Sequence, residues 1–270
     1  MGSVEGVAET KGALYQALPA EGVAIINADD AFASFFSGLA SGRRQLRFGL
    51  DHKADVGADI VEQRVDGSRF VLSTPVGDAE VDLPLAGRHN IANALAAASI
   101  ALALDVPLDT IAEGLEQVPG VAGRLKLERM PGGWTLIDDS YNANPGSVGA
   151  AIDTLALAPH DSGCERWLVL GDMAELGTGA KELHAGIGRR AKERGIDRLF
   201  AVGPLSAATV AAFGANGEHH ADKDALVASL RKHLHGGVTC LVKGSRSAGM
   251  EQVVAALRND KPEEGAFHAA

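Results

Sequence analysis

The chain has 270 residues, of which 46% are hydrophobic and 22% charged, and its formal net charge is −10. This length suits one large domain or two ordinary ones, and the hydrophobic content excludes a disordered chain. The acidic balance, without a run of Lys and Arg, argues against a nucleic-acid or membrane-surface partner. A nucleotide ligand stays open, because it needs only a few local donors.

The two cysteines, Cys164 and Cys240, are far apart in the sequence, which suits a reducing cytosol better than a disulfide framework. The first ten residues lack the apolar core of a signal peptide. The Ala-rich run 91–106 is too short and too polar to cross a bilayer. We therefore expect a soluble, cytoplasmic protein without a membrane span.

The first part of the chain mixes helices and strands. The elements predicted there, in chain order, are a helix over 11–18, a buried strand over 22–27, β-hairpins between 45 and 85 with turns at 66–67 and 77–78, and a helix from Asn90. Pro and Gly are dense over 118–133, which marks a domain junction. We therefore expect two domains, 1–120 and 121–270.

The second part alternates apolar strands with helices. Strands are predicted over 134–137, 167–170, 199–202 and 238–242, and helices near 148–157, 181–194, 205–213, 223–234 and 247–257. A strand-to-strand spacing of roughly 30 residues is the size of a βαβ unit, so we expect a parallel, Rossmann-like sheet. Ligands of such sheets bind at the carboxyl ends of strands, where this sequence carries DDSYNANPGS, GDMAELG and KGSRSAG.

Asn90 and Asn93 lie three residues apart at the predicted helix start, in GRHNIANALAA, and so share a face. A carboxamide offers a donor and an acceptor together, as the edge of an adenine ring requires. A helix cap at Asn90 explains the same pattern, and on spacing alone the cap is the favoured interpretation.

Several charged residues stand at the junction and at the strand ends. Arg124, after Gly123, would reach a phosphate if hinge closure brought it over a nucleotide, although a solvated linker arginine is the simpler interpretation. Asp139 ends a strand, where a carboxylate accepts ribose hydroxyls, unless it belongs to an ordinary polar turn. Lys243 and Arg246 flank a Gly-Ser turn before a helix, which suits an anion.

The order and wording of these segments is more specific than any one of them. GRHNIANALAAA, GRL, DDSYNANPGS, LGDMAELG and LVKGSRSAGME resemble the MurF family of Mur ligases, and the resemblance covers essentially the whole chain. It implies an α/β fold, with the C-terminal part of a central ATP-binding domain followed by a Rossmann-like C-terminal domain. It also implies ATP- and Mg²⁺-dependent addition of D-alanyl-D-alanine to UDP-N-acetylmuramoyl-tripeptide through an acyl phosphate, in peptidoglycan precursor synthesis.

The resemblance implies a role for each candidate residue. Asn90 and Asn93 would hold adenine, Asp139 the ribose and Arg124 the phosphates. Lys11 corresponds to the family's carbamylated lysine, which helps to hold Mg²⁺; a surface helix lysine is the plain alternative. The candidates for contacts with the substrate or D-alanyl-D-alanine are Tyr141, Asn142, Asn144, Lys243, Ser245 and Arg246.

The sequence departs from the family in its phosphate loop. It contains no Gly-Lys dipeptide, and GTGAKE at 177–182 lacks the glycine that the loop GTxGKT requires before its lysine. We interpret the chain as an N-terminally shortened ligase, monomeric and inactive by itself. Two alternatives stay open: another Mur-type or folylpolyglutamate-type ligase, and a non-catalytic nucleotide-binding module.

Overall fold

The computed structural model describes residues 3–259, which form two compact units. Unit 1 comprises residues 3–63 and 67–118, and unit 2 comprises residues 64–66 and 119–259. Residues 1–2 and 260–270 of the two expected domains lie outside the described residues. Both units combine helices with sheets, which confirms the predicted α/β class. Within the described part of the chain, no helix is long and apolar enough to cross a membrane.

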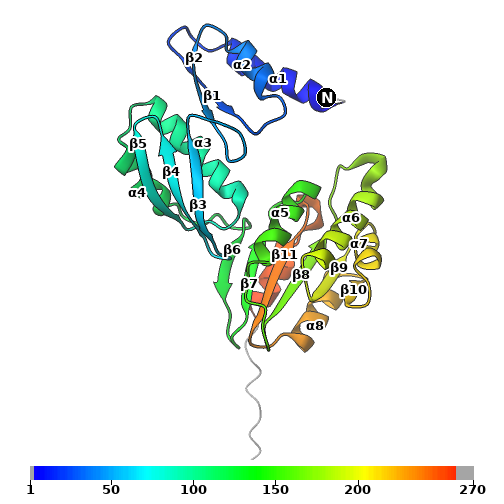
Figure 1. Ribbon diagram of the computed structural model, residues 1–270. Helices are drawn as coiled ribbons and strands as arrows, with labels where there is room; N and C mark the ends of the chain where they lie inside the picture. Colours follow the sequence, from blue (N-terminus) through cyan, green and yellow to red (C-terminus); the bar gives the residue numbers. More distant parts are fainter. Residues whose placement is uncertain (1–2, 260–270) are drawn as a thin grey trace, which may run out of the picture. The chain divides into compact units, whose positions relative to one another are not determined.

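Unit 1 contains a small parallel sheet between helices (Figure 1). Strand β1 (Val23–Asn27) pairs with β2 (Arg44–Phe48). Alternate residues of β1 face opposite layers: Ala24 and Ile26 pack toward α1 (Val4–Gln16) and α2 (Ala33–Leu39), whereas Val23 and Ile25 join the core under α3 (Arg88–Ala103). This alternation is the period of a strand covered on both faces.

A three-stranded antiparallel sheet completes unit 1. It consists of β3 (Gly57–Gln63), β4 (Ser68–Thr74) and β5 (Gly77–Leu83), and its core lies against α3 and α4 (Leu108–Glu116). The hairpin turn between β4 and β5 is formed by Pro75 and Val76, so the turn predicted at 77–78 was placed too late. Proline fits a turn because it cannot donate a hydrogen bond to the ladder.

Unit 2 is built on a six-stranded sheet of order β10-β9-β8-β11-β7-β6. Its strands are β6 (Lys126–Arg129), β7 (Thr135–Asp139), β8 (Glu165–Gly171), β9 (Arg198–Val202), β10 (Gly217–His220) and β11 (Val238–Lys243). All pairs are parallel except β6 with β7. The helices are α5 (Pro145–Leu155), α6 (Ala180–Glu193), α7 (Ser206–Phe213), α8 (Lys223–His233) and α9 (Glu251–Arg258).

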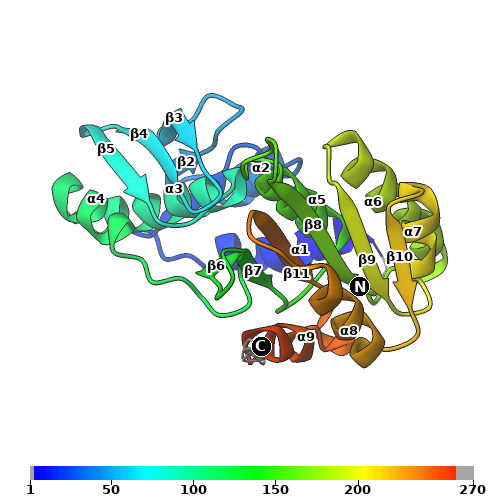
Figure 2. The same ribbon diagram turned by 90° about the horizontal axis from the view of Figure 1, so that it is seen from below.

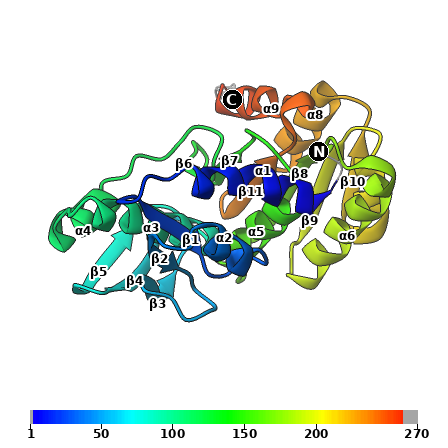
Figure 3. The same ribbon diagram turned by 90° about the horizontal axis from the view of Figure 1, so that it is seen from above.

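Helices cover both faces of this sheet (Figures 2 and 3). Along β8, Trp167 and Val169 enter the core that contains residues of α8 and α9, whereas Leu168 and Leu170 enter the core that contains residues of α5, α6 and α7. The helices that follow β7 and β8 thus pack on one face of the sheet, and the helix that follows β11 packs on the other face. The carboxyl ends beside β11 are therefore the topological switch points, where α/β sheets bind ligands.

Helices in both units begin at other residues than predicted. The last helix was predicted from residue 247, but α9 begins at Glu251, after a short 3₁₀ turn η2 (Arg246–Ala248). A second 3₁₀ turn, η1 (Gly177–Gly179), precedes α6. In unit 1, α1 begins seven residues before the predicted start at Lys11, because Ser3 caps it by accepting from the Gly6 amide.

Candidate functional site

A buried ion pair joins the ends of β7 and β11. The Lys243 Nζ lies 2.7 Å from Asp139 Oδ2 and also donates to the Asn142 carbonyl at 2.7 Å. The side chains of Lys243 and Asp139 are only 4% and 12% exposed. Burial is the largest influence on the Asp139 carboxyl and raises its pKa, although Lys243 acts in the opposite direction. Two residues expected to contact ligands thus bind each other.

Asp138, the other aspartate at the end of β7, has different partners. Asp138 Oδ1 accepts from the Ser140 hydroxyl and amide, and its Oδ2 accepts from Arg258 of α9. Arg258 also donates to Glu128 of β6, and this hydrogen bond is the main reason why the Glu128 pKa is lowered. Asp138 therefore ties α9 to the sheet, and Asp139 is the aspartate at the candidate site.

Arg124 sits in a short segment with an unusual backbone. Gly123 has φ +73° and Leu125 φ +50°, so left-handed residues flank the arginine. A Cβ at Gly123 would lie 3.1 Å from the Tyr141 amide nitrogen, and that amide donates to the Gly123 carbonyl at 3.0 Å. The Leu125 amide donates to Asp139 Oδ1 at 3.3 Å. Only glycine fits this approach without strain at position 123.

Tyr141 brings two arginines together. The Arg124 guanidinium carbon lies over the Tyr141 ring, 4.6 Å from its centroid, and that of Arg246 lies 5.9 Å from it. The Tyr141 side chain is half exposed. Arg246 has a distant carboxylate neighbour, Glu251 at 3.9 Å, whereas the structure records no ion pair for Arg124 within residues 3–259. Two guanidiniums at one edge of the sheet suit an anion.

The two asparagines after Tyr141 have local partners. Asn144 is the N-cap of α5: its side chain accepts from the Ser147 amide at 2.8 Å, and the Ser147 hydroxyl accepts from the Asn144 amide. Pro145 occupies the first helical position, as expected for such a start. Asn142 is exposed, and its Oδ1 accepts from the Ala143 amide. Both asparagines are exposed, and the carboxamide oxygen of each already accepts a backbone hydrogen bond.

Ser245 fastens the loop after β11 to the loop after β8. Its hydroxyl and its amide both donate to the Asp172 carbonyl, at 2.6 and 3.0 Å. The Asp172 carboxylate in turn accepts from the Ser206 amide and hydroxyl, so it caps α7 rather than the helix that follows it in the sequence. Ser245 is buried and holds the loops together.

In unit 1, Asn90 and Asn93 share a face of α3, as predicted. Asn93 Nδ2 lies 3.4 Å from Asn90 Oδ1, and Asn90 Nδ2 donates to the Ala86 carbonyl at 2.8 Å. The N-cap of α3 is Gly87, so the alternative of a cap at Asn90 is wrong. Asn93 is exposed, and the structure records no partner for its Oδ1 among residues 3–259. This carboxamide oxygen is accessible to a ligand.

Lys11 lies exposed on α1, and no ion pair or hydrogen bond of its side chain is recorded in the described part of unit 1. Residues 3–259 contain no group of three or more His, Cys, Asp or Glu side chains that could hold a metal ion. Mg²⁺ prefers oxygen ligands, which a carbamate on Lys11 would supply only in part. Mg²⁺ is usually held by one or two carboxylates together with waters and substrate phosphates, so a carbamate on Lys11 would be one ligand among several.

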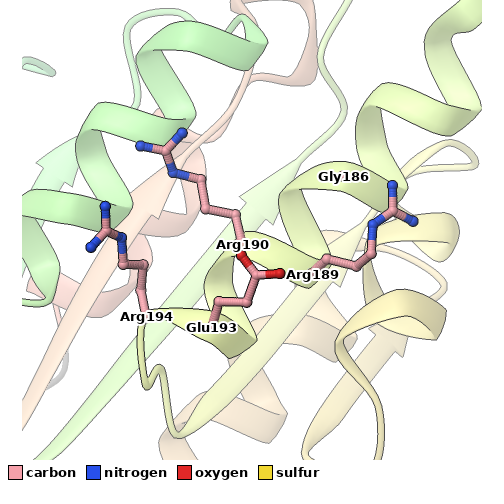
Figure 4. Close-up of a pocket in the computed structure, with 5 residues that line it drawn as sticks. All are labelled: Gly186, Arg189, Arg190, Glu193 and Arg194. Atoms are coloured by element: carbon pink, nitrogen blue, oxygen red, sulfur yellow. The ribbon is translucent and has the colours of Figure 1, made fainter.

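A cavity of about 590 Å³ lies away from this site, on α6. It is lined by Gly186, Arg189, Arg190, Glu193 and Arg194 (Figure 4). Arg190 and Arg194 point toward α5 and pair with Asp153, whereas Arg189 points the other way and pairs with Glu182. Arg189, Arg190 and Arg194 each form an ion pair with a carboxylate, whereas none is recorded for Arg124 within residues 3–259.

Sequence reasoning missed Leu125 and Asp172 as parts of the site's framework. A positive φ at leucine leaves no trace in the sequence except the adjacent Gly-Arg. Asp172 belongs to the strand-end segment GDMAELG, and in the structure it caps α7. That partner depends on the packing of two loops, which no local pattern predicts.

Known protein families match this chain in two segments. The Mur ligase middle domain matches residues 1–101, and the Mur ligase glutamate ligase domain matches residues 123–246. The UDP-N-acetylmuramoyl-tripeptide--D-alanyl-D-alanine ligase of Escherichia coli (strain K12) is 44% identical over 262 residues, which are 96% of this chain and 57% of that protein. The ligase of the same name from Mycobacterium tuberculosis (strain H37Rv) is 36% identical over 282 residues, 96% of this chain and 55% of that protein.

Solved structures agree. A crystal structure of MurF from Acinetobacter baumannii superimposes with a TM-score of 0.85 at 32% identity, over 96% of this chain and 56% of that chain. MurF from Thermotoga maritima in complex with ADP has a TM-score of 0.81 at 21% identity, over 95% and 58% of the two chains, and shows the shared fold. These comparisons confirm the expected Mur-type fold, and the chain spans little more than half the length of these relatives.

Proposed function

This chain belongs to the Mur ligase family, and we propose that it supplies part of an ATP-dependent ligase that joins D-alanyl-D-alanine to UDP-N-acetylmuramoyl-tripeptide. The identity of 44% with the Escherichia coli ligase of that name carries the proposal. Within it, unit 1 belongs to the C-terminal part of the central ATP-binding domain and unit 2 is the C-terminal domain. The whole reaction is not assigned to these residues alone, because they span 57% of that relative.

Two of the three proposed nucleotide contacts, Arg124 and Asn93, are exposed, whereas the third, Asp139, is buried. Arg124 is exposed, and no ion pair is recorded for it within residues 3–259, so its guanidinium would bind the phosphates of ATP. Asn93 would bind adenine with the carboxamide that Asn90 orients. Asp139 would accept a ribose hydroxyl with the remaining lone pair of Oδ1. ATP, once bound, supplies the phosphoryl group that activates the substrate carboxylate, and positioning and charge neutralisation by groups such as Arg124 support that transfer.

The proposed contacts with the amine substrate are Arg246 and Asn142. Arg246 is 71% exposed, and its guanidinium suits the carboxylate of D-alanyl-D-alanine in a bidentate contact. Tyr141, Asn144, Lys243 and Ser245 were also expected to contact substrate. Each of them has a partner within unit 2, which supports a framework role for them.

A chimaeric ligase tests the proposal. These 270 residues would replace the matching part of the Escherichia coli relative, and amide formation from UDP-N-acetylmuramoyl-tripeptide, D-alanyl-D-alanine, ATP and Mg²⁺ would be measured. We expect turnover, a loss of about a hundredfold in Arg124→Met, and little change in the control Arg189→Met, whose arginine is already paired. A preference for a single amino acid over D-alanyl-D-alanine would contradict the proposed acceptor.

The isolated chain offers a second test. Calorimetry should show saturable, weak ADP binding that Asn93→Ala removes, and the chain should form no amide by itself because the phosphate loop GTxGKT is not in its sequence. Amide formation by the purified 270 residues would contradict the proposed division of tasks.

A further inference from the structure

The segment that carries Arg124 adopts a conformation that its own sequence disfavours. Leu125 has φ +50°, in the left-handed region that a residue with a Cβ enters only at an energetic cost. Such a conformation persists where the surroundings over-determine it, and this kind of strain concentrates at functional sites. The contacts that hold Leu125 in place are therefore informative about Arg124, its neighbour.

Both neighbours of Arg124 are tied to the end of β7. The Gly123 carbonyl accepts from the Tyr141 amide at 3.0 Å, and the Leu125 amide donates to Asp139 Oδ1 at 3.3 Å. Asp139 is itself fixed by Lys243, whose ammonium lies 2.7 Å from its other oxygen. The Arg124 backbone is thus held from both sides, by the last residue of β7 and by a residue of the turn that follows it.

The side chain of Arg124 is held by a different contact. Its guanidinium lies over the Tyr141 ring at 4.6 Å from the centroid, within the range of a cation–π interaction. Stacking on a ring uses the face of a guanidinium and leaves the N–H donors at its edge free. An ion pair with a carboxylate would use those donors, and within residues 3–259 none is recorded for Arg124.

We propose that Tyr141 and the Asp139–Lys243 pair are positioning residues for Arg124. They hold its backbone and its guanidinium in place before a ligand arrives, so that Arg124 binds phosphate groups without first losing its side-chain freedom. The nature of the anion rests on the proposed function, whereas the positioning does not. Tyr141 and Lys243 thereby act through Arg124 rather than on the substrate.

The positioning is tested first without ligand, by ¹⁵N relaxation of the Arg124 Nε–H group in the full chain. Tyr141→Phe keeps the ring and should leave the Nε order parameter unchanged. Tyr141→Leu removes the ring and should lower it to a flexible value, below about 0.6. Arg190, which pairs with Asp153, serves as the internal control and should not change. An unchanged Arg124 in Tyr141→Leu would overturn the proposal.

The ion pair is tested through the Leu125 amide. In Asp139→Asn/Lys243→Met no buried charge is left unpaired, so the fold is retained, but the acceptor for Leu125 is no longer fixed by Lys243. Hydrogen exchange of the Leu125 amide should become about tenfold faster. Exchange at the wild-type rate would show that the pair does not hold Leu125, and the proposal would lose this part.

Ligand binding separates this inference from the proposed function. By calorimetry, ADP should bind about fivefold more weakly to Tyr141→Leu than to wild type or Tyr141→Phe, and adenosine, which has no phosphates, should bind all three equally. If wild type bound no ADP while the relaxation result held, the nucleotide assignment would fail and the positioning would stand. If ADP bound Tyr141→Leu as well as wild type, the positioning role would fail and the nucleotide site would stand.

Discussion

Replacing Lys243 by Met should strongly destabilise unit 2, because it leaves the buried Asp139 carboxylate without its cation. The side chains of the two residues are 4% and 12% exposed, and 2.7 Å separates their charged atoms. Met retains an unbranched stem that fills similar space, so the loss reports charge rather than volume. Removing one partner of a buried pair costs about 3–5 kcal/mol, mostly because the remaining charge is unpaired.

Two further variants separate this cause from general damage. Asp139→Asn/Lys243→Met removes both charges and should recover most of the lost free energy of unfolding. A deficit of about 1 kcal/mol should remain for the hydrogen bond that Lys243 gives to the Asn142 carbonyl. Arg189→Met breaks an exposed pair with Glu182 and should change the free energy of unfolding by less than about 0.5 kcal/mol.

The loss should also depend on pH in a defined direction. Burial raises the pKa of Asp139 above its ordinary value of 3.8, and Lys243 opposes this effect, so removing Lys243 raises the pKa further. A folded-state pKa above the unfolded one means that the folded chain binds the proton more tightly. The free energy of unfolding of the variant therefore rises as the pH falls through the folded pKa, and the increase ends near 3.8.

Urea unfolding followed by tryptophan fluorescence measures these effects in unit 2 alone. The two tryptophans, Trp134 and Trp167, are both buried in that unit. A loss below about 1 kcal/mol at neutral pH would refute the reasoning, since a buried orphan charge costs more than that. A double variant as unstable as the single one would refute it too, because the cost would then not come from the unpaired carboxylate.

Three further predictions use the same chain. Gly123→Ala should lower the free energy of unfolding in urea by about 1–2 kcal/mol, because the φ of Gly123 is +73° and a Cβ there would meet Tyr141. Gly120 has open space around it, so Gly120→Ala should leave the free energy of unfolding unchanged, and equal effects of the two substitutions would contradict the reasoning. Asn144→Ala should cost about 1 kcal/mol in the same assay through the lost cap of α5, and an unchanged midpoint would show that the cap is dispensable. Burial raises the pKa of Cys240 to about 12, so a thiol reagent should label only Cys164 in the folded chain. Labelling of the folded Cys164→Ser variant would show that Cys240 is reactive and would contradict the prediction.

The central strands of unit 2 could be predicted from the sequence because they are continuous apolar runs. β8 and β11, which are covered on both faces, begin and end close to the predicted residues. The edge strands could not be predicted in this way. β10 reads Gly-Glu-His-His and β6 reads Lys-Leu-Glu-Arg, and charged residues are what edge strands carry against unwanted pairing. Apolar periodicity does not detect such strands.

The candidate site could be predicted only residue by residue. Asn144, Pro145 and Ser147 carry the sequence signature of a helix start, and that local signal supports the cap that the structure shows. Lys243 and Asp139 had no such signal, because their pairing depends on the strand order. Chain order would place β8 beside β7, but the last strand, β11, lies between them. The partner of a strand-end lysine therefore depends on topology.

The same topology explains why the accessible donors gather on one side of β11. Of its two switch points, the one beside β8 is filled: a Cβ at Gly171 or Gly244 would lie within 2.8 Å of Met250, and Ser245 bonds to the Asp172 carbonyl across the gap. The switch point beside β7 holds Arg124 and Arg246 around Tyr141. We therefore expect an anionic ligand of unit 2 on the β7 side, near the two guanidiniums, and we expect a side chain at Gly244 to disturb the packing on the β8 side.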